Sequence, residues 1–333
     1  MIIPFFIPHS GCPHQCVFCN QKNIIGQAAP TAPSAVPRKI REHLSTHKAD
    51  GPVHIAFYGG SFTGLPQETQ QSYLEAAQPF IRSGQITSIR LSTRPDTITR
   101  GNLAFLRTYH VKTIELGAQS MDDQVLALAG RGHTAADTVN AVDLLRAYGF
   151  TIGLQLMPGL PGDSSGLFMR TIDEIIALRP DVVRLYPALV IKGTPLEGLF
   201  RSNQYVPLSI EEAVSLCRDA LLRFEQAGIG VIRIGLQATE ELDNPGTILA
   251  GPYHPAFREL VESSLFLDAM RSVLRQRRET RGSVTVQVNP KDLSAAIGQR
   301  RSNIDILKKE FALQELRIVE GTAAHGRRAP ILL

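Results

Sequence analysis

The sequence has no long apolar run and few cysteines. The first absence argues against a membrane-spanning protein, and the second against a disulfide-stabilised one. No stretch among its 333 residues approaches the roughly 18 apolar residues that cross a bilayer. The opening MIIPFFIP lacks a basic start and runs directly into cysteines, so it predicts a first buried strand and not a secretion signal. Four cysteines, three of them clustered, fit a reducing cytoplasm better than a disulfide framework. We therefore expect a cytoplasmic protein with no membrane partner.

Charge is distributed unevenly along the chain. Residues 271–333 carry 13 Lys and Arg against 6 Asp and Glu, whereas residues 1–270 carry 22 against 25. A basic segment of this kind either faces a polyanion or forms a solvated surface. Charge alone leaves both readings open.

The stretch SGCPHQCVFCNQ holds three cysteines in the spacing CxxxCxxC: Cys12, Cys16 and Cys19. A zinc site normally takes four ligands, so His9 or His14 would have to complete it. Three thiolates on one loop also suit a 4Fe-4S cluster whose fourth iron stays open to another molecule. Cys217 lies in a helical pattern and is predicted to be a core residue. The spacing by itself leaves both metals possible.

Short β-branched runs alternate with helical patterns along most of the chain. After the opening strand, strands are predicted at residues 53–60, 86–95, 111–120, 150–159, 181–190 and 230–237, and helices at 66–81, 122–130, 134–149, 165–180 and 209–228. This alternation predicts an α/β fold, a parallel sheet closed as a full or partial (β/α) barrel of about six units. Chemistry is then expected at the carboxyl ends of the strands.

Motifs with glycine and polar residues follow these strands. They are YGGSFTGLP from residue 58, STRPD from 92, ELGAQS from 115, RGHT from 131, MPGLPGD from 157 and LYPALVIKGTPL from 185. A glycine pair more often marks a tight turn than a ligand, but it also lets a backbone approach a ligand closely. Together with the cysteines, the motifs resemble the radical S-adenosylmethionine (SAM) superfamily. Over about residues 1–240 they are most similar to the radical SAM domain of the Elongator catalytic subunit, a tRNA wobble-uridine enzyme family.

The resemblance implies two cofactors, a 4Fe-4S cluster on the three cysteines and SAM on its open iron. An electron from the cluster would cleave SAM to a 5′-deoxyadenosyl radical, so an electron donor such as a ferredoxin or flavodoxin is also implied. Phe18 would cover the cluster, Gly59 and Gly60 would receive the amino group of SAM, and Gln119 and Arg131 would hold its ribose and carboxylate. The complete predicted SAM site is Phe18, Gly59, Gly60, Ser61, Ser92, Gln119, Arg131 and Gln155.

The chain departs from both families that it resembles. The order of Gln119 and Arg131 matches oxygen-independent coproporphyrinogen oxidases, but that family has acidic residues where this chain has Ser92 and Gln155. Elongator enzymes have more residues between the first two cysteines than this chain has, and they carry a C-terminal acetyl-CoA-binding domain. The residues that follow the predicted barrel here contain no Gly-rich acyl-CoA loop. Acetyl-CoA-dependent carboxymethyl chemistry is therefore not expected. Four further residues are predicted as possible substrate contacts: Tyr58, Tyr186, Lys192 and His254.

Residues 283–320 predict a strand, a helix, a short turn, a helix and a strand. This order, with IGQRRSNI between the helices, resembles the KH family, whose GxxG loop lies against the nucleic-acid backbone. Gly298 matches the first glycine, but Arg301 occupies the second. The predicted RNA contacts are Lys291, Gly298, Gln299, Arg300, Arg301 and Lys308. The alternative is a small α/β cap without a ligand.

Four segments are predicted: a radical SAM barrel over residues 1–255, a connecting helical segment over 256–281, a small α+β KH-like domain over 282–321 and a tail over 322–333. The predicted protein is a radical SAM enzyme acting on RNA, with tRNA favoured. One alternative is a small-molecule enzyme related to coproporphyrinogen oxidases, in which the tail is a cap. The other is a zinc-dependent RNA-binding protein without catalysis.

Overall fold

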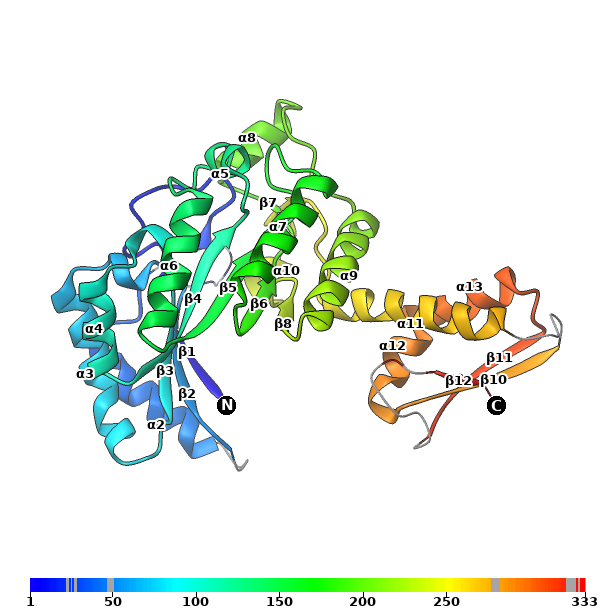
Figure 1. The fold of residues 1–333 in the computed structure, drawn as a ribbon, viewed down its shortest axis with the longest axis horizontal. Helices are drawn as coiled ribbons and strands as arrows, with labels where there is room; N and C mark the ends of the chain where they lie inside the picture. Colours follow the sequence, from blue (N-terminus) through cyan, green and yellow to red (C-terminus); the bar gives the residue numbers. More distant parts are fainter. Residues whose placement is uncertain are drawn as a thin grey trace. The chain divides into compact units, whose positions relative to one another are not determined.

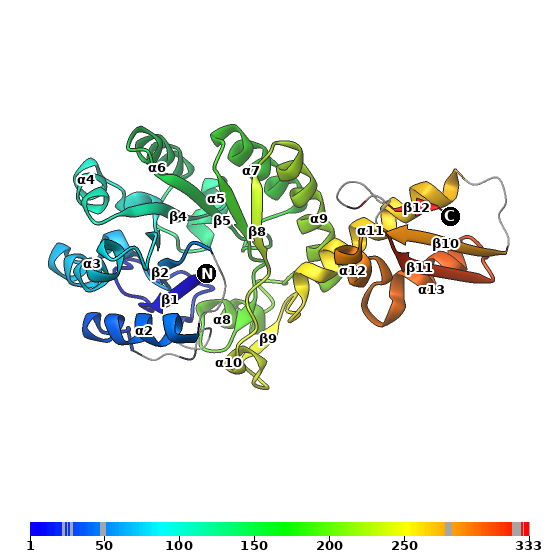
Figure 2. The same cartoon turned by 90° about the horizontal axis from the view of Figure 1, so that it is seen from below.

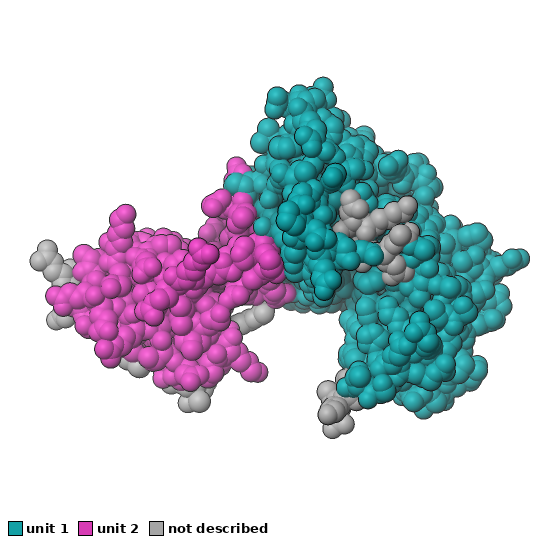
Figure 3. Space-filling model, turned by 180° about the vertical axis from the view of Figure 1, so that it is seen from behind, with its two compact units in different colours: residues 1–209, 223–253 teal, residues 210–222, 254–333 magenta. Residues whose placement is uncertain are grey.

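The chain forms two compact units. The computed structural model describes residues 1–21, 24, 26, 29–46, 51–276, 282–321, 328 and 330–332. The first unit comprises residues 1–209 and 223–253, and the second comprises residues 210–222 and 254–333 (Figure 3). Within the described ranges, no helix is long and apolar enough to cross a membrane.

A curved parallel sheet forms the centre of the first unit (Figure 1). In the described part of the chain it has seven strands, in the order β1 (Ile2–Phe6), β2 (His54–Tyr58), β3 (Ser88–Thr93), β4 (Val111–Gln119), β5 (Thr151–Leu156), β6 (Val182–Leu185) and β8 (Gly230–Ile234). Every neighbouring pair of these strands is parallel. The prediction of a partial (β/α) barrel is confirmed.

Helices line the outer side of this curved sheet (Figure 2). They are α2 (Val36–Thr46), α3 (Gln67–Arg82), α4 (Arg100–Thr108), α6 (Ala135–Ala147) and α7 (Ser165–Leu178). Shorter elements lie in the connections: α5 (Asp123–Leu128), α8 (Pro195–Arg201), α10 (Glu240–Asp243) and an antiparallel pair, β7 (Val190–Ile191) with β9 (Ile248–Ala250). Helix α9 (Ile210–Gln226) spans the division between the units.

The two faces of the sheet differ in chemistry because side chains alternate along each strand. One set of alternate positions is apolar and buried, as in Leu91 on β3 and Leu154 on β5. The other set carries Arg90, Glu115 and Arg184, whose side chains meet one another across β3, β4 and β6. The apolar set packs under the helices, so the concave face of the sheet is polar. We call this concave, polar side of the sheet the lumen.

The second unit has its own small sheet and apolar core. Its elements are α11 (Phe257–Arg275), β10 (Ser283–Val288), α12 (Leu293–Ile297), α13 (Ser302–Glu310), β11 (Glu315–Glu320) and β12 (Ile331–Leu332). Strand β10 pairs in parallel with β11 and antiparallel with β12. Phe266 and Met270 of α11 pack with Val286 and Ile304. The predicted strand-helix-helix-strand order is present, whereas most of the predicted tail, residues 322–333, lies outside the described residues.

Candidate functional site: a cysteine loop at the carboxyl ends of the strands

The loop that carries the three cysteines leaves β1 and is fastened to its neighbours by backbone hydrogen bonds. Ile7 N donates to Tyr58 O at 2.8 Å, and Ser61 N donates to Ser10 O at 2.8 Å. Further along, Val17 N donates to Ala129 O at 3.0 Å, just after α5. The loop is thus held at the carboxyl end of the sheet, where the fold predicts chemistry.

Glycines make this close packing possible. A Cβ on Gly60 would lie 2.5 Å from Ile7 O and 2.5 Å from Ser10 O, so the missing side chain leaves room for the cysteine loop. Gly59 has a φ of +89°, which favours glycine, and a Cβ there would meet nothing closer than 3.6 Å. Gly60 therefore positions the loop, while the Gly59 carbonyl accepts from His9 N at 3.0 Å and keeps its second lone pair.

The two histidines near the cysteines are engaged in packing the loop. His9 Nε2 accepts from Gln21 N at 3.0 Å, and His9 N donates to Gln21 Oε1 at 2.6 Å. The His14 ring lies against Gly132, where a Cβ would come within 2.4 Å of it. Both histidines therefore already take part in the packing of the loop.

The three thiols differ in exposure and lie near two arginines, Arg94 and Arg131: Cys16 is buried, Cys19 is half-buried and Cys12 is exposed. Burial, and then the neighbouring Cys16, raise the pKa of Cys12, while Arg94 and Arg131 oppose the rise. Burial, and then the other two thiols, raise the pKa of Cys19 to about 12. Arg131 Nη1 donates to Cys16 Sγ at 3.1 Å. The protein alone thus disfavours the ionised forms of Cys12 and Cys19, and a bound metal is what would favour their thiolate forms.

Two buried arginine donors beside these thiols have no partner. Arg131 Nε and Arg94 Nη1 are both buried and unpaired within the described part of the chain. The remaining donors of Arg131 reach Cys16 and Gly117 O, and Arg94 pairs with Asp96. Unsatisfied cationic donors next to three thiols suit an anionic thiolate cluster with an anionic ligand on it. The residues present therefore fit a 4Fe-4S cluster and the SAM carboxylate.

The structure brings several of the predicted SAM residues together. Gln155 Nε2 donates to Gln119 Oε1 at 3.2 Å, although the two residues lie on different strands. Gln119 has a φ of +68° where the register between β4 and β5 shifts. Phe18 packs with Met157 and Tyr186 in a small apolar cluster.

Two serines of the predicted set differ in accessibility. Ser61 is fully buried, and its hydroxyl lies 3.1 Å from Thr93 Oγ1, so it already serves the packing of this turn. Ser92 is half-buried on the concave face of β3, in register with Glu115. The role of each in binding SAM stays a prediction.

A second group of side chains lies on the concave face, and we call it the lumen network: Tyr58, Arg90, Glu115, Arg184 and Tyr186. Glu115 Oε1 accepts from Arg90 Nε at 2.9 Å, and Glu115 Oε2 lies 2.5 Å from Arg184 Nε. Tyr58 OH donates to Glu115 Oε1 at 3.2 Å, and Arg184 Nη1 donates to Tyr186 OH at 3.1 Å. Burial and then Glu115 raise the pKa of Tyr58, which keeps its hydroxyl protonated. The network joins two of the predicted substrate contacts.

The other two predicted substrate contacts, Lys192 and His254, hydrogen-bond to residues outside this network. The backbone oxygen of Lys192 accepts from Asn20 Nδ2 at 3.0 Å, which places Lys192 beside the cysteine loop. His254 belongs to the second unit, where its Nδ1 accepts from Ala256 N at 3.0 Å. The predicted RNA contacts also belong to the second unit. Gly298, Gln299, Arg300 and Arg301 among them form the turn between α12 and α13.

Sequence reasoning missed three buried residues of this site: Arg94, His133 and Glu115. Burial, followed by Arg131 and Arg94, lowers the pKa of His133 to about 4, so the ring is neutral at pH 7. Arg94 donates to the backbone oxygen of Arg131. Both lie inside motifs that the sequence shows, STRPD and RGHT, but only their contacts reveal their part in the site.

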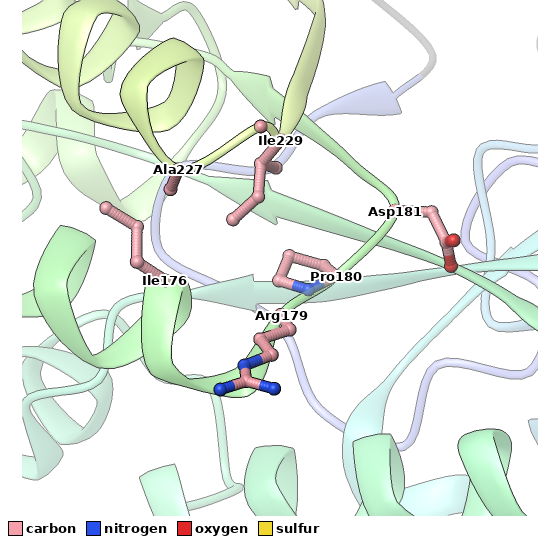
Figure 4. Close-up of a pocket in the computed structure, with 7 residues that line it drawn as sticks. Ile176, Arg179, Pro180, Asp181, Ala227 and Ile229 are labelled. Carbon is pink, nitrogen blue, oxygen red and sulfur yellow. The ribbon is translucent and has the colours of Figure 1, made fainter.

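A hollow of about 500 Å³ lies at the other end of the strands (Figure 4). Ile176, Ala227 and Ile229 line it, together with Arg179 from the turn after α7. Asp181 accepts from Ile152 N at 2.7 Å, so its carboxylate helps to hold the sheet. This hollow is at the amino ends of β6 and β8, away from the cysteines.

Residues 6–175 match the radical SAM superfamily, and residues 180–266 match the radical SAM C-terminal domain. The chain belongs to the radical SAM superfamily. It is therefore an enzyme of the kind that uses a 4Fe-4S cluster and SAM, and the zinc-dependent, non-catalytic alternative is set aside. The predicted resemblance is confirmed.

Some of the curated relatives that this chain matches carry the names of tRNA-uridine and Elongator proteins. The chain is 27% identical to a tRNA uridine(34) acetyltransferase of Methanocaldococcus infernus, over 62% of this chain and 46% of that protein. It is 28% identical to Elongator complex protein 3 of Bos taurus, over 63% of this chain and 46% of that protein. The chain thus spans about half the length of these curated relatives.

A solved structure supports the fold. The archaeal Elp3 of Methanocaldococcus infernus with an N-terminal deletion superimposes with a TM-score of 0.61 at 22% identity. The match covers 79% of this chain and 62% of that one. It shows that this radical SAM enzyme shares the fold of that protein.

Proposed function

We propose that this radical SAM enzyme modifies RNA, with tRNA as the favoured substrate. The observation that carries the proposal is the 27% identity, over 62% of the chain, to a protein named tRNA uridine(34) acetyltransferase. Because the match covers only 46% of that protein, the acetyl transfer in its name is not carried over. The substrate class is proposed, and the second reactant is left open.

Within the barrel, Cys12, Cys16 and Cys19 would hold the cluster. When bound, the cluster and SAM supply a 5′-deoxyadenosyl radical. The task of the chain is then to orient SAM and keep the reacting groups away from water. The backbone at Gly59 is open to the amino group of SAM, and Arg131 is cationic toward its carboxylate. Gln119 and Gln155, which already hydrogen-bond to each other, would hold the ribose side.

In the second unit, the turn between α12 and α13 would meet the phosphates of the RNA. Arg300 and Arg301 are exposed and have φ values of +50° and +67°, so Arg301 keeps the conformation that a glycine would favour. A Cβ on Gly298 would come within 2.6 Å of Ser302 Oγ. Buried Asn303 donates to Ala296 O at 3.1 Å and fixes the end of α12 beneath the turn.

The charges of this turn support nucleic-acid binding. Two adjacent exposed guanidiniums on a rigid turn suit phosphate oxygens, and Lys291 and Lys308 add charge on the same unit. Gln299 would contribute a hydrogen bond. A KH-like role for the unit, a ferredoxin or flavodoxin as electron donor and a cytoplasmic location complete the proposal.

The first experiment compares tRNA nucleosides from cells with and without the gene, by mass spectrometry. Loss of one modified nucleoside on deletion, restored by the intact gene and not by a Cys16→Ala gene, supports the proposal. An unchanged nucleoside profile contradicts it.

A binding experiment tests the second unit. Replacing Arg300 and Arg301 together with Glu should weaken tRNA binding across sequences and reduce the salt slope by about one to two units. The matched control replaces Arg275 and Arg317, two exposed arginines of the same unit outside this turn, with Glu. Equal binding by both double variants would show that the turn does not contact RNA.

A further inference from the structure

The lumen network has an excess of positive charge that none of the proposed roles uses. Glu115 is 6% exposed and is its one carboxylate, whereas Arg90 and Arg184 both pair with it. The register of β6 with β8 places Arg233 directly beside Arg184 on the same face. Arg233 has no carboxylate partner among the described residues. Three guanidiniums therefore face one carboxylate.

Some donors of these arginines remain available. A guanidinium has five N–H donors. Arg90 uses its Nε and Nη2 on Glu115, and its Nη1 has no partner in the described ranges. The side chains of Arg90 and Arg184 are 15% and 17% exposed, and neither appears among the buried unpaired atoms. These donors consequently open onto the lumen and are not sealed within the protein.

The depth of the network limits what can reach it. Arg90 and Glu115 lie three and four residues before the carboxyl ends of β3 and β4, and Arg184 lies one residue before the end of β6. Because Arg90 and Arg184 are only partly exposed, they suit a small oxyanion better than the surface of a nucleic acid. Two hydroxyls, on Tyr58 and Tyr186, lie at the same level and can donate or accept.

We propose that the lumen network and Arg233 bind the carboxylate or phosphate of a small organic anion, which is a substrate or co-substrate of the radical reaction. Planar guanidinium forks suit both oxyanions, and the bound anion offsets the excess charge of the lumen. This inference rests on the proposed function only in assuming that the radical reaction takes place inside the barrel. It assigns a chemical class to the second reactant, which the proposed function left unidentified.

The test is a binding measurement on the anaerobically reconstituted holoenzyme without RNA. Succinate and inorganic phosphate are titrated separately by calorimetry at constant ionic strength, so that the two arms distinguish a carboxylate from a phosphate. Arg233→Gln removes a guanidinium that holds no carboxylate in the described structure. It should weaken binding of the preferred probe roughly tenfold or more, the typical worth of a hydrogen bond to a charged group. Arg38→Gln, on the outer surface of the same unit, should leave binding unchanged.

A second variant changes the charge in the opposite direction. Glu115→Gln removes the carboxylate that competes for the arginines, so it should tighten anion binding if the variant folds. If Glu115→Gln does not fold, the Arg233→Gln measurement alone tests the proposal. Saturable binding of one probe that Arg233→Gln weakens supports the proposal and names the anion class. Absence of saturable binding of either probe, or equal affinity in Arg233→Gln and the unaltered protein, overturns it. Neither result depends on the tRNA nucleoside comparison.

Discussion

Replacing Gly60 with alanine should displace the cysteine loop. The new Cβ would lie 2.5 Å from the carbonyl oxygens of Ile7 and Ser10. Because non-bonded heavy atoms pack at about 3.5–4.0 Å, both backbone segments would have to move by about an ångström. Overpacking of this kind costs about 1–3 kcal/mol. The strain falls on the segment that leads directly into Cys12, so cluster binding should suffer first.

Gly59→Ala is the matched comparison. A Cβ at Gly59 has no neighbour within 3.6 Å, and the φ of +89° adds a backbone cost of about 1–2 kcal/mol. Both variants are reconstituted anaerobically and measured for iron, sulfide and SAM affinity. We expect Gly60→Ala to lose most of its iron, and Gly59→Ala to keep iron but bind SAM more weakly. Full iron content and unaltered SAM affinity in Gly60→Ala would refute the reasoning.

Three further predictions concern charge, pH and backbone strain. Arg131→Met removes the cation at Cys16, so the reduction potential of the cluster should fall in an EPR-monitored titration; an unchanged potential would contradict the contact. The pKa of His133 is lowered to about 4 from an unfolded value of about 6.5, so its contribution is present above pH 6.5 and lost toward pH 4. His133→Gln should therefore lose about 2 kcal/mol less stability than the unaltered protein between pH 7 and pH 5 in urea unfolding, and equal losses would count against it. Arg301→Gly should be more stable than Arg301→Ala by about 1 kcal/mol because of the φ of +67°, while both weaken RNA binding; equal unfolding midpoints would argue against a strained turn.

The barrel was predictable because its strands are short β-branched runs separated by helical patterns. Four described helices of the first unit were not predicted: α2, α4 and the short α8 and α10. Helix α2 begins at Val36, directly before Pro37 and after two further prolines, Pro30 and Pro33, which obscure its start. Helix α4 has only nine residues, and its capping box at Thr99 and Asn102 is a short signal. Both α2 and α4 are amphipathic, so helical periodicity is present in their sequences; the prolines at the start of α2 and the short length of α4 are what obscured them.

The site was predictable where the sequence places its residues close together, as in the cysteine motif. The lumen network was not, because its members come from β2, β3, β4 and the β6 segment, and only the sheet register joins them. Bulk charge was also misleading. Residues 1–270 carry 22 basic against 25 acidic residues, which gives no sign of a basic site, yet their lumen concentrates arginines. The net charge of a segment therefore does not predict the local charge on the concave face of its sheet.

The most direct test of the account is the production of 5′-deoxyadenosine by the reconstituted protein with SAM and a strong reductant. Cys12→Ala, Cys16→Ala and Cys19→Ala should each abolish it. Cys217→Ala should not, because Cys217 is fully buried within α9 and burial raises its pKa. We predict that only the unaltered protein and the Cys217→Ala variant produce 5′-deoxyadenosine. Product from a variant of the cysteine loop, or loss of product and iron in Cys217→Ala, would contradict the assignment of the three cysteines.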